Sequence, residues 1–434
     1  MEYGLIGYPL KHSFSKEIHS LISNYNYEIK ELKENELNIF MREKDFKGIN
    51  VTIPYKQKVI PYLDIVDSDA KNINAVNTII NRDGKLIGYN TDILGVLATF
   101  SYFNINIENK NVLILGTGAT SNTVHYAVKK CKAKNIYKAY RDNSKIKGDI
   151  LYNDLSKTFD NINIIINTTS NGMYPHADDP LLVDLNKFKN LEAVMDVVYN
   201  PLRTRLLIES EKLGLKSVSG LYMLVAQAYF ASELFMNTDF DIDNQNLIEQ
   251  FKIINNNQKN ICINKCETVY NKCLSSKINI VLSGMPTCGK TTLGKMISEK
   301  YGYEFIDTDE LIEKKINCKI VDYINKFGEE NFRKIESEII KEVSSKNHLV
   351  ISSGGGAILR DENVINFKSN GKIFFINRSL ELLKPSSDRP LTNDLESLKK
   401  KYDERLPIYK ATCDYEVNGD TEFDIRIKDI LANV

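Results

Sequence analysis

The stretch "LSGMPTCGKTTLG", residues 282–294, places Gly284, Gly289, Lys290 and Thr291 at the spacing G-x-x-x-x-G-K-[ST]. A strand-like run precedes it and a helical pattern follows, which is the context that a phosphate-binding loop requires. In such a loop the backbone N–H groups surround the phosphates, the lysine reaches the β- and γ-oxygens, and the Thr291 hydroxyl binds Mg²⁺. We therefore predict an ATP-binding P-loop domain over residues 278–434, with a parallel sheet flanked by helices. The loop residues expected at the nucleotide are Gly284, Cys288, Gly289, Lys290, Thr291 and Thr292.

A second loop of different design lies at "NVLILGTGATSNTV", residues 111–124. Gly116 and Gly118 follow a strand-like run and open a helix, as in dinucleotide-binding folds, although Ser121 stands at the third glycine position. A tight strand–helix turn is the alternative. The next strand ends without an acid at Tyr140, and Arg141 follows, which favours a ribose 2′-phosphate and hence NADP.

The bulk composition describes a globular chain that is long enough for two or three domains. Its 434 residues carry 57 Lys plus Arg and 57 Asp plus Glu, so no overall charge attracts nucleic acid or an anionic membrane. The seven scattered cysteines suit a reducing compartment. The most apolar segment, residues 220–236, is interrupted by Gln227, Ser232 and Glu233, and the N-terminus has no signal-peptide pattern. We expect a cytoplasmic α/β protein, monomer or homodimer, without nucleic-acid or membrane partners.

Further motifs follow the P-loop. "FIDTDELIE" places Asp307 and Asp309 on alternate positions of a strand end, where one would serve Mg²⁺ and the other a substrate hydroxyl; a helix N-cap is the alternative. Arg333 and Glu336 share a helix face, which a simple salt bridge would also explain. Gly354–Gly356 follow a strand, and "SSDRPLTND" resembles a lid.

In order and spacing, residues 278–434 resemble shikimate kinase. The resemblance implies that Asp309 binds substrate hydroxyls and takes part in proton transfer, and that Asp307 lies near Mg²⁺. It assigns the shikimate carboxylate to Arg333 and Arg405, the pocket lining to Gly355 and Gly356, and the transferring phosphoryl group to Arg389. Thr287 departs from the family pattern, because a glycine usually stands at that position.

The front of the chain offers an acid–base pair. "GINVTIPYK" ends in Lys56, and "GYNTDILG" contains Asp92. Either residue alone is usually a solvated surface group. Together they make chemical sense, because the alkoxide left by hydride addition to a ketone needs a proton, which an ammonium beside a carboxylate can supply.

With "HSFSKEIH", "AVNTII", "INTTSNGM", "DVVYNPLRT" and "GLYMLVAQA", these motifs resemble shikimate dehydrogenase over residues 1 to about 255. The resemblance implies a catalytic pair of Lys56 and Asp92, and a substrate site in a first α/β domain, residues 1–100, completed by helices around 221–252. It implies a Rossmann domain at 101–220 for NADP(H). The expected substrate-binding residues are Ser13, Ser15, Thr52, Asn77, Tyr199 and Gln227; the expected cofactor-binding residues are Gly116, Gly118, Ala119, Thr120, Ser121, Arg141, Asn167, Thr168, Gly220 and Met223.

Residues 253–277 are rich in Asn and Lys and interrupt the strand–helix alternation, so we expect a linker that is partly helical. The whole chain is then expected to reduce 3-dehydroshikimate to shikimate with NADPH and to phosphorylate shikimate with ATP and Mg²⁺. Two alternatives stay open. The front half is a non-catalytic dehydrogenase-like module on a working small-metabolite kinase, or the back half phosphorylates another small alcohol.

Overall fold

The computed structural model describes residues 1–10, 13–141, 148–157, 159–236, 256–383 and 395–434. Its contacts divide the chain into two compact units, one built from residues 1–173, 179–199 and 209–273 and the other containing 274–434. We call them the front unit and the back unit and describe each by itself. Within the described residues, no helix is long and apolar enough to cross a membrane.

The front unit begins with a mixed six-stranded sheet in the order β2-β1-β3-β5-β6-β4. Its outer strands run parallel to their neighbours, whereas β5 is antiparallel to both β3 and β6. The strands are β1 (Tyr3–Gly7), β2 (Tyr27–Glu31), β3 (Gly48–Val51), β4 (Ile65–Val66), β5 (Thr78–Arg82) and β6 (Lys85–Tyr89); the helices are α1 (Ser15–Ile22), α2 (Glu34–Glu43), α3 (Ser68–Ile73) and the 3₁₀ turn η1 (Ile60–Tyr62).

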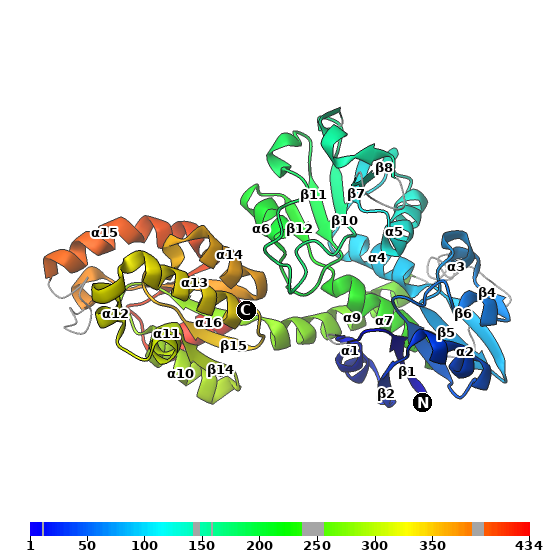
Figure 1. Cartoon of the computed structure of the whole chain (residues 1–434), viewed down its shortest axis with the longest axis horizontal. Coiled ribbons are helices and arrows are strands. Elements are labelled where there is room, and N and C mark those ends of the chain that lie inside the picture. The colour runs from blue at the N-terminus through cyan, green and yellow to red at the C-terminus, as the bar shows by residue number, and fades with distance from the viewer. Residues whose placement is uncertain (11–12, 142–147, 158, 237–255, 384–394) are drawn as a thin grey trace. The chain divides into compact units, whose positions relative to one another are not determined.

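A second sheet of the front unit is parallel throughout, in the order β12-β11-β10-β7-β8-β9 (Figure 1). The strand order reverses at β7, and ligands of such sheets bind where this reversal occurs, at the carboxyl ends of the strands. The strands are β7 (Asn111–Leu115), β8 (Asn135–Tyr140), β9 (Ile150–Leu151), β10 (Ile164–Asn167), β11 (Ala193–Asp196) and β12 (Lys216–Val218), with α5 (Ala119–Lys130), α6 (Arg205–Lys212), η2 (Tyr152–Lys157) and η3 (Leu185–Lys187) between them.

Helices α4 (Thr91–Tyr102) and α7 (Leu221–Met236) pack against each other between these two sheets. Gly95 permits this close approach, because a Cβ atom there would lie 2.7 Å from the carbonyl oxygen of Met223. Both helices carry predicted site residues, so their packing fixes how those residues face each other.

Helix α9 (Asn256–Lys277) covers most of the predicted linker, and its residues up to Cys273 belong to the front unit. Cys266 and Cys273 are buried, and Tyr270 lies edge-on to Tyr222, at 5.4 Å between ring centroids. The Tyr102 hydroxyl donates to Glu267, at 3.1 Å. This part of the predicted linker is therefore a structural element of the front unit, and Cys266 is part of its core.

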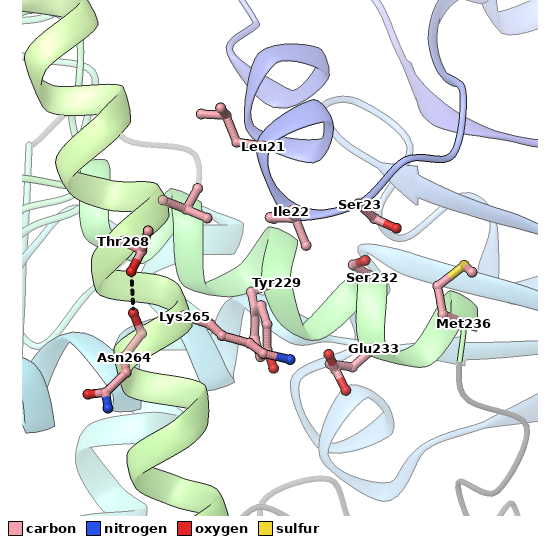
Figure 2. A pocket seen from close by; sticks show the side chains of 11 residues that line it. Leu21, Ile22, Ser23, Tyr229, Ser232, Glu233, Met236, Asn264, Lys265 and Thr268 are labelled. Carbon is pink, nitrogen blue, oxygen red and sulfur yellow. Dashed lines mark hydrogen bonds between the residues drawn. The ribbon is translucent and has the colours of Figure 1, made fainter.

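A cavity of about 660 Å³ opens between α1, α7 and α9 (Figure 2). Tyr229, Glu233 and Lys265 line it, and none of the predicted site residues does. The cavity is thus separate from the groups to which the sequence assigns chemistry.

The back unit is one parallel five-stranded sheet in the order β14-β15-β13-β16-β17, which places the strand before the P-loop at its centre. The predicted P-loop architecture is confirmed. The strands are β13 (Asn279–Ser283), β14 (Glu304–Asp307), β15 (Leu349–Ser352), β16 (Gly371–Asn377) and β17 (Tyr415–Asn418); the helices are α10 (Lys290–Tyr301), α11 (Thr308–Ile316), α12 (Ile320–Phe327), α13 (Glu329–Ser344), α14 (Asp361–Asn370), α15 (Leu395–Thr412), α16 (Phe423–Ala432), η4 (Ala357–Leu359) and η5 (Leu380–Leu382).

Candidate active sites

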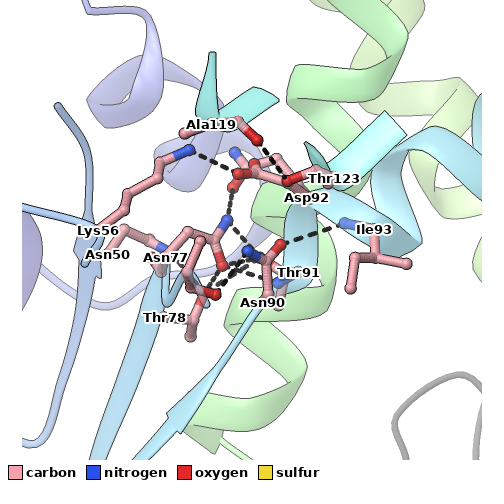
Figure 3. Close-up of polar contacts among 12 residues, drawn as sticks. Asn50, Lys56, Asn77, Thr78, Asn90, Thr91, Asp92, Ile93, Ala119 and Thr123 are labelled. Atoms are coloured by element: carbon pink, nitrogen blue, oxygen red, sulfur yellow. Dashed lines mark hydrogen bonds and ion pairs between the residues drawn. The ribbon is translucent and has the colours of Figure 1, made fainter. Parts of the chain in front are cut away.

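Lys56 and Asp92 form a close ion pair in the front unit (Figure 3). The ammonium nitrogen lies 2.6 Å from the Asp92 Oδ2 atom, and the two side chains are only 18% and 14% exposed. Asp92 lies in the first turn of α4, which is capped by the Asn90 side chain. The nearby pair of Lys58 and Glu34 is 42% and 75% exposed, as is usual for surface ion pairs. The shielding of Lys56 and Asp92 fits a pair that exchanges a proton with a bound ligand.

Asn77 is held beside this pair by a buried hydrogen-bond network (Figure 3). Its Oδ1 atom accepts the backbone N–H of Thr91 at 2.7 Å, and its amide nitrogen lies 3.5 Å from Gln227 Oε1 on α7. Asn50 supports Asn77 from behind by donating to its carbonyl oxygen at 3.3 Å. The structure thus brings together the predicted Asn77 and Gln227, and it orients Asn77 through Thr91, which the sequence did not single out.

Ser13 and Ser15 lie at the start of α1. The Ser13 hydroxyl oxygen accepts the backbone N–H of Ser15 at 3.2 Å, and Phe14 between them packs on the Tyr199 ring at 5.2 Å. Burial raises the pKa of Tyr199, so its phenol stays a hydroxyl donor at neutral pH. Thr52 follows β3 and packs its methyl group over Gly7, where a Cβ atom would lie 2.5 Å away.

His19 anchors the serine-bearing helix to the sheet. It is fully buried, stacks on Tyr27 with ring centroids 3.8 Å apart, and its Nδ1 atom lies 2.6 Å from the Tyr25 hydroxyl. Burial lowers the pKa of His19 to about 3, so the imidazole is neutral around neutral pH. His19 is therefore a packing residue of this site, and its neutrality makes the packing sensitive to acid.

The loop after β7 is shaped for a phosphate group. Gly116 has φ +107°, a conformation that other residues avoid, and a Cβ atom there would lie 2.8 Å from the Thr169 methyl group. Gly118 starts α5 without a side-chain cap, and a Cβ atom at Gly118 would have open space around it. Free N–H groups at a helix start bind anions, and Ala119 and Thr120 supply the first of them.

Ser121 explains how the loop does without a third glycine. It is fully buried, and its hydroxyl donates to the Gly116 carbonyl oxygen at 2.8 Å, which ties the helix to the loop. Thr168 donates to the Leu115 carbonyl at 2.7 Å, and Asn167 donates to Asp196 at 3.0 Å. Asn167 and Thr168 therefore brace the strand ends around the loop.

The remaining predicted cofactor residues lie on both sides of this sheet edge. Arg141 directly follows β8 and is exposed. Met223 is buried in the first turn of α7. Gly220 precedes that helix, and a Cβ atom there would collide with the Val197 carbonyl oxygen. Gly220 thus has a steric reason to be glycine.

The P-loop in the back unit combines three residues with positive φ. Gly284 and Gly289 have φ +146° and +100°, and Thr287 has φ +65°. The Lys290 ammonium is buried and donates to the carbonyl oxygens of Gly284 and Met285 at 2.9 and 3.0 Å. Thr287 stands where the family usually has glycine, and its left-handed backbone gives the physical reason for that usual choice.

Thr291 and Asp307 provide oxygen atoms suited to Mg²⁺. The Thr291 hydroxyl donates to Asp307 Oδ2 at 3.0 Å and lies 3.4 Å from the Ser352 hydroxyl. Mg²⁺ prefers such hard oxygen ligands, so these residues fit the ion.

The prediction that Asp307 and Asp309 share one strand is wrong. β14 ends at Asp307, whose other oxygen caps α11 by accepting the Asp309 backbone N–H at 3.1 Å. Asp309 therefore lies in the first helical turn, with its carboxylate against Gly354, where a Cβ atom would lie 2.6 Å from Asp309 Oδ1.

Arg333 and Arg405 approach the same glycine turn, Gly354–Gly356. Arg405 is buried and donates to the Gly355 carbonyl oxygen at 3.1 Å, and the Tyr409 hydroxyl donates to the same oxygen at 2.6 Å. Arg333 lies against Gly356, where a Cβ atom would be 2.5 Å from Nη2. Glycine at 356 thus makes room for the guanidinium.

The expected salt bridge of Arg333 exists as well, since Arg333 donates to Glu336 at 2.8 Å. Burial raises the pKa of Glu336, although Arg333 opposes this.

Arg389 lies outside the described residues. Thr308, Ser352 and Tyr409 contact the site without having been predicted; only Tyr409 carried a sequence signal, four residues after Arg405 in a helix.

Taken together, fold and sites define a class: a dinucleotide-type α/β unit with a shielded Lys–Asp pair, joined in one chain to a P-loop unit with arginines around a glycine turn. The comparisons with known proteins agree with this class. Residues 5–79 match the family model of the shikimate dehydrogenase substrate binding domain, and residues 286–433 match that of shikimate kinase.

Among curated relatives, shikimate dehydrogenase (NADP(+)) of Methanococcus maripaludis is 37% identical over 258 residues, which cover 55% of this chain and 93% of that protein. The enzyme of the same name from Clostridium perfringens is 35% identical over 267 residues, covering 58% and 98%.

Two solved structures are also similar. Shikimate dehydrogenase 1 of Peptoclostridium difficile has a TM-score of 0.52 at 30% identity and covers 63% of this chain and 98% of its own. A chorismate mutase/shikimate 5-dehydrogenase fusion protein of Clostridium acetobutylicum has a TM-score of 0.53 at 32% identity, covering 62% and 97%. This chain belongs to the shikimate dehydrogenase family, and its back unit carries a shikimate kinase domain.

Proposed function

We propose that this chain is a bifunctional enzyme of the shikimate pathway. The front unit reduces 3-dehydroshikimate to shikimate with NADPH, and the back unit phosphorylates shikimate with ATP and Mg²⁺. The observation that carries the proposal is that one chain contains both the shielded Lys56–Asp92 pair and the paired arginines at Gly354–Gly356. The first arrangement suits reduction of a ring ketone, and the second suits binding of the carboxylate on the same ring acid.

In the front unit, Lys56 is the proton donor for reduction. NADPH, when bound, would supply the hydride to the substrate carbonyl. The Lys56 ammonium gives a proton to the resulting alkoxide, and Asp92, 2.6 Å away, stabilises the ammonium and orients it. Asn77, Gln227 and Thr52 bind the ring hydroxyls. Ser13, Ser15 and the Tyr199 phenol hold the carboxylate.

The phosphate-shaped loop at Gly116–Ser121 fits the cofactor pyrophosphate, because its helix start is uncapped by side chains and Gly118 leaves space. Arg141 would hold the 2′-phosphate at the end of β8, and Met223 would lie near the nicotinamide. These assignments follow the family pattern and the placement of the residues.

In the back unit, Arg333 and Arg405 hold the shikimate carboxylate, since guanidinium groups suit bidentate carboxylate binding. Asp309 orients the hydroxyl that is phosphorylated and accepts its proton. Lys290 would contact the transferring phosphoryl group, and Thr291 and Asp307 would hold Mg²⁺, which would neutralise phosphate charge. Most of the catalysis is then positioning and charge neutralisation. The proposed kinase domain spans 278–434, and the cytoplasmic location stays a prediction.

A substrate panel tests the kinase assignment. The protein with MgATP is given shikimate, shikimate methyl ester and a nucleoside, and ADP formation is followed. We expect turnover of shikimate and a loss of about tenfold or more for the ester, because the ester removes the charge that the arginines bind. Preference for the nucleoside would reject the assignment.

A further inference from the structure

Two arginines beside the P-loop are not used by the proposed mechanism. Arg426 lies on α16 and is only 4% exposed; Arg378 directly follows β16. Within the part of the chain that the structure describes, Arg426 Nη1 and Arg378 Nε are buried and have no hydrogen-bond partner. Buried donors of this kind are rare in proteins, and each one needs an explanation.

Arg426 reaches the P-loop from α16, and Arg378 follows β16, the strand against which the P-loop begins. Arg426 Nη1 lies 3.6 Å from the position that a Cβ atom of Gly289 would take, and the guanidinium stacks on Phe423 with its central carbon 4.7 Å from the ring centroid. The first glycine of the P-loop, Gly284, packs closely on β16: a Cβ atom on Gly284 would lie 2.9 Å from the Ile376 carbonyl oxygen. Arg378 is two residues beyond Ile376.

The charges around Arg426 favour an anion. Burial lowers the pKa of Arg426, and the positive charge of Arg378 lowers it further, whereas Asp420 and Glu422 act in the opposite direction. Asp420 is already engaged, since it accepts the backbone N–H of Ser379 at 2.9 Å. A phosphate oxygen near Arg426 would relieve the repulsion between the guanidinium groups and satisfy a free donor.

We propose that Arg426, with Arg378 beside it, binds the α-phosphate of the nucleotide. The backbone of a P-loop surrounds the α- and β-phosphates, and its lysine serves the β- and γ-phosphates, so the α-phosphate is the group without a cationic side chain. Arg426 is the buried cation next to that backbone, at Gly289. It is a nucleotide-binding residue in addition to those of the P-loop motif. The inference rests on the proposed nucleotide site of the back unit.

Thio-substitution of the nucleotide tests this contact. The full-length protein and its Arg426→Met variant are each titrated calorimetrically with two ligands. The first is MgADP, and the second is the Mg²⁺ complex of ADP in which sulfur replaces an oxygen on the α-phosphorus. We expect Arg426→Met to weaken ADP binding about tenfold, as for a charged hydrogen bond. Sulfur is a poor acceptor, so one thio-diastereomer should bind more weakly than ADP to the parent protein, and this difference should vanish in the variant.

Lys428→Met is the matched control, because Lys428 is exposed on the same helix and the change removes the same charge. It should leave both affinities within about twofold of the parent values. An unchanged thio effect in Arg426→Met, or equal weakening by Lys428→Met, overturns the proposal. Binding is measured without shikimate, so the result stands apart from the substrate assignment; a protein that binds ADP but does not phosphorylate shikimate contradicts only the proposed function.

Discussion

Replacing Lys56 by Met separates the two activities of the chain most clearly. The substitution keeps the length of the side chain and removes the ammonium that lies 2.6 Å from Asp92. The reduction then loses its proton donor at a site where both partners are less than 20% exposed, at 18% and 14%, so bulk water is a poor substitute. General acid–base catalysis contributes about 10²–10⁴-fold, and we expect kcat for reduction to fall by that factor.

The assay follows NADPH absorbance with 3-dehydroshikimate, and ADP formation with shikimate is measured on the same preparation. The kinase rate should stay within about twofold, because Lys56 belongs to the front unit. Lys58→Met serves as the control, since the Lys58 pair with Glu34 is exposed. If Lys56→Met retains more than about a tenth of the parent kcat, the assigned acid is wrong.

Three further changes probe other parts of the structure. Lys290→Ala should abolish ADP formation and leave reduction unchanged, because it removes the buried cation of the P-loop. His19 stays neutral in the fold down to about pH 3, whereas the unfolded chain takes up a proton below about 6.5. Stability is therefore lost as the pH falls, by about 1.4 kcal/mol at pH 5.5, and denaturant unfolding of His19→Gln should lack this loss. Tyr270→Ala should lower the unfolding free energy of the front unit by about 2–4 kcal/mol, measured by urea unfolding, because its ring packs on Tyr222.

Each of these expectations has a result that contradicts it. Loss of reduction in Lys290→Ala would mean that the units are not independent. If the unfolding free energy has the same pH dependence in the parent protein and in His19→Gln, burial of a neutral His19 is not the cause of the acid sensitivity. Asn271→Ala changes an exposed neighbour on α9, and destabilisation equal to that of Tyr270→Ala would show that the packing of the Tyr270 ring on Tyr222 is not the cause of the loss.

The sequence predicted the elements whose chemistry depends on local spacing. The P-loop and the strand–helix alternation follow from short motifs, and the structure confirms their architecture. Lys56 and Asp92 are 36 positions apart, and their pairing was predicted from the chemistry of ketone reduction and from the family resemblance, not from spacing. The strand assumed to run through Asp309 was wrong, because Asp307 caps a helix instead and helix capping competes with strand continuation for the same residue.

Contacts that depend on distant segments could not be predicted. Tyr409 meets the Gly355 carbonyl across 54 positions, and Thr91 meets Asn77 across 14. The Asn- and Lys-rich composition of residues 253–277 suggested a linker, yet Cys266 and Tyr270 pack on the front unit. Local composition could not reveal that partner surface, which is assembled from α4 and α7.

The central claim is that one ring acid made in the front unit is consumed in the back unit. The full chain is incubated with 3-dehydroshikimate, NADPH and MgATP, and all products are identified by mass spectrometry. We predict shikimate phosphorylated at its 3-hydroxyl, with one NADPH oxidised for each ADP formed. Shikimate that accumulates without phosphorylation, or NADPH that stays reduced while ATP is consumed, would contradict the account.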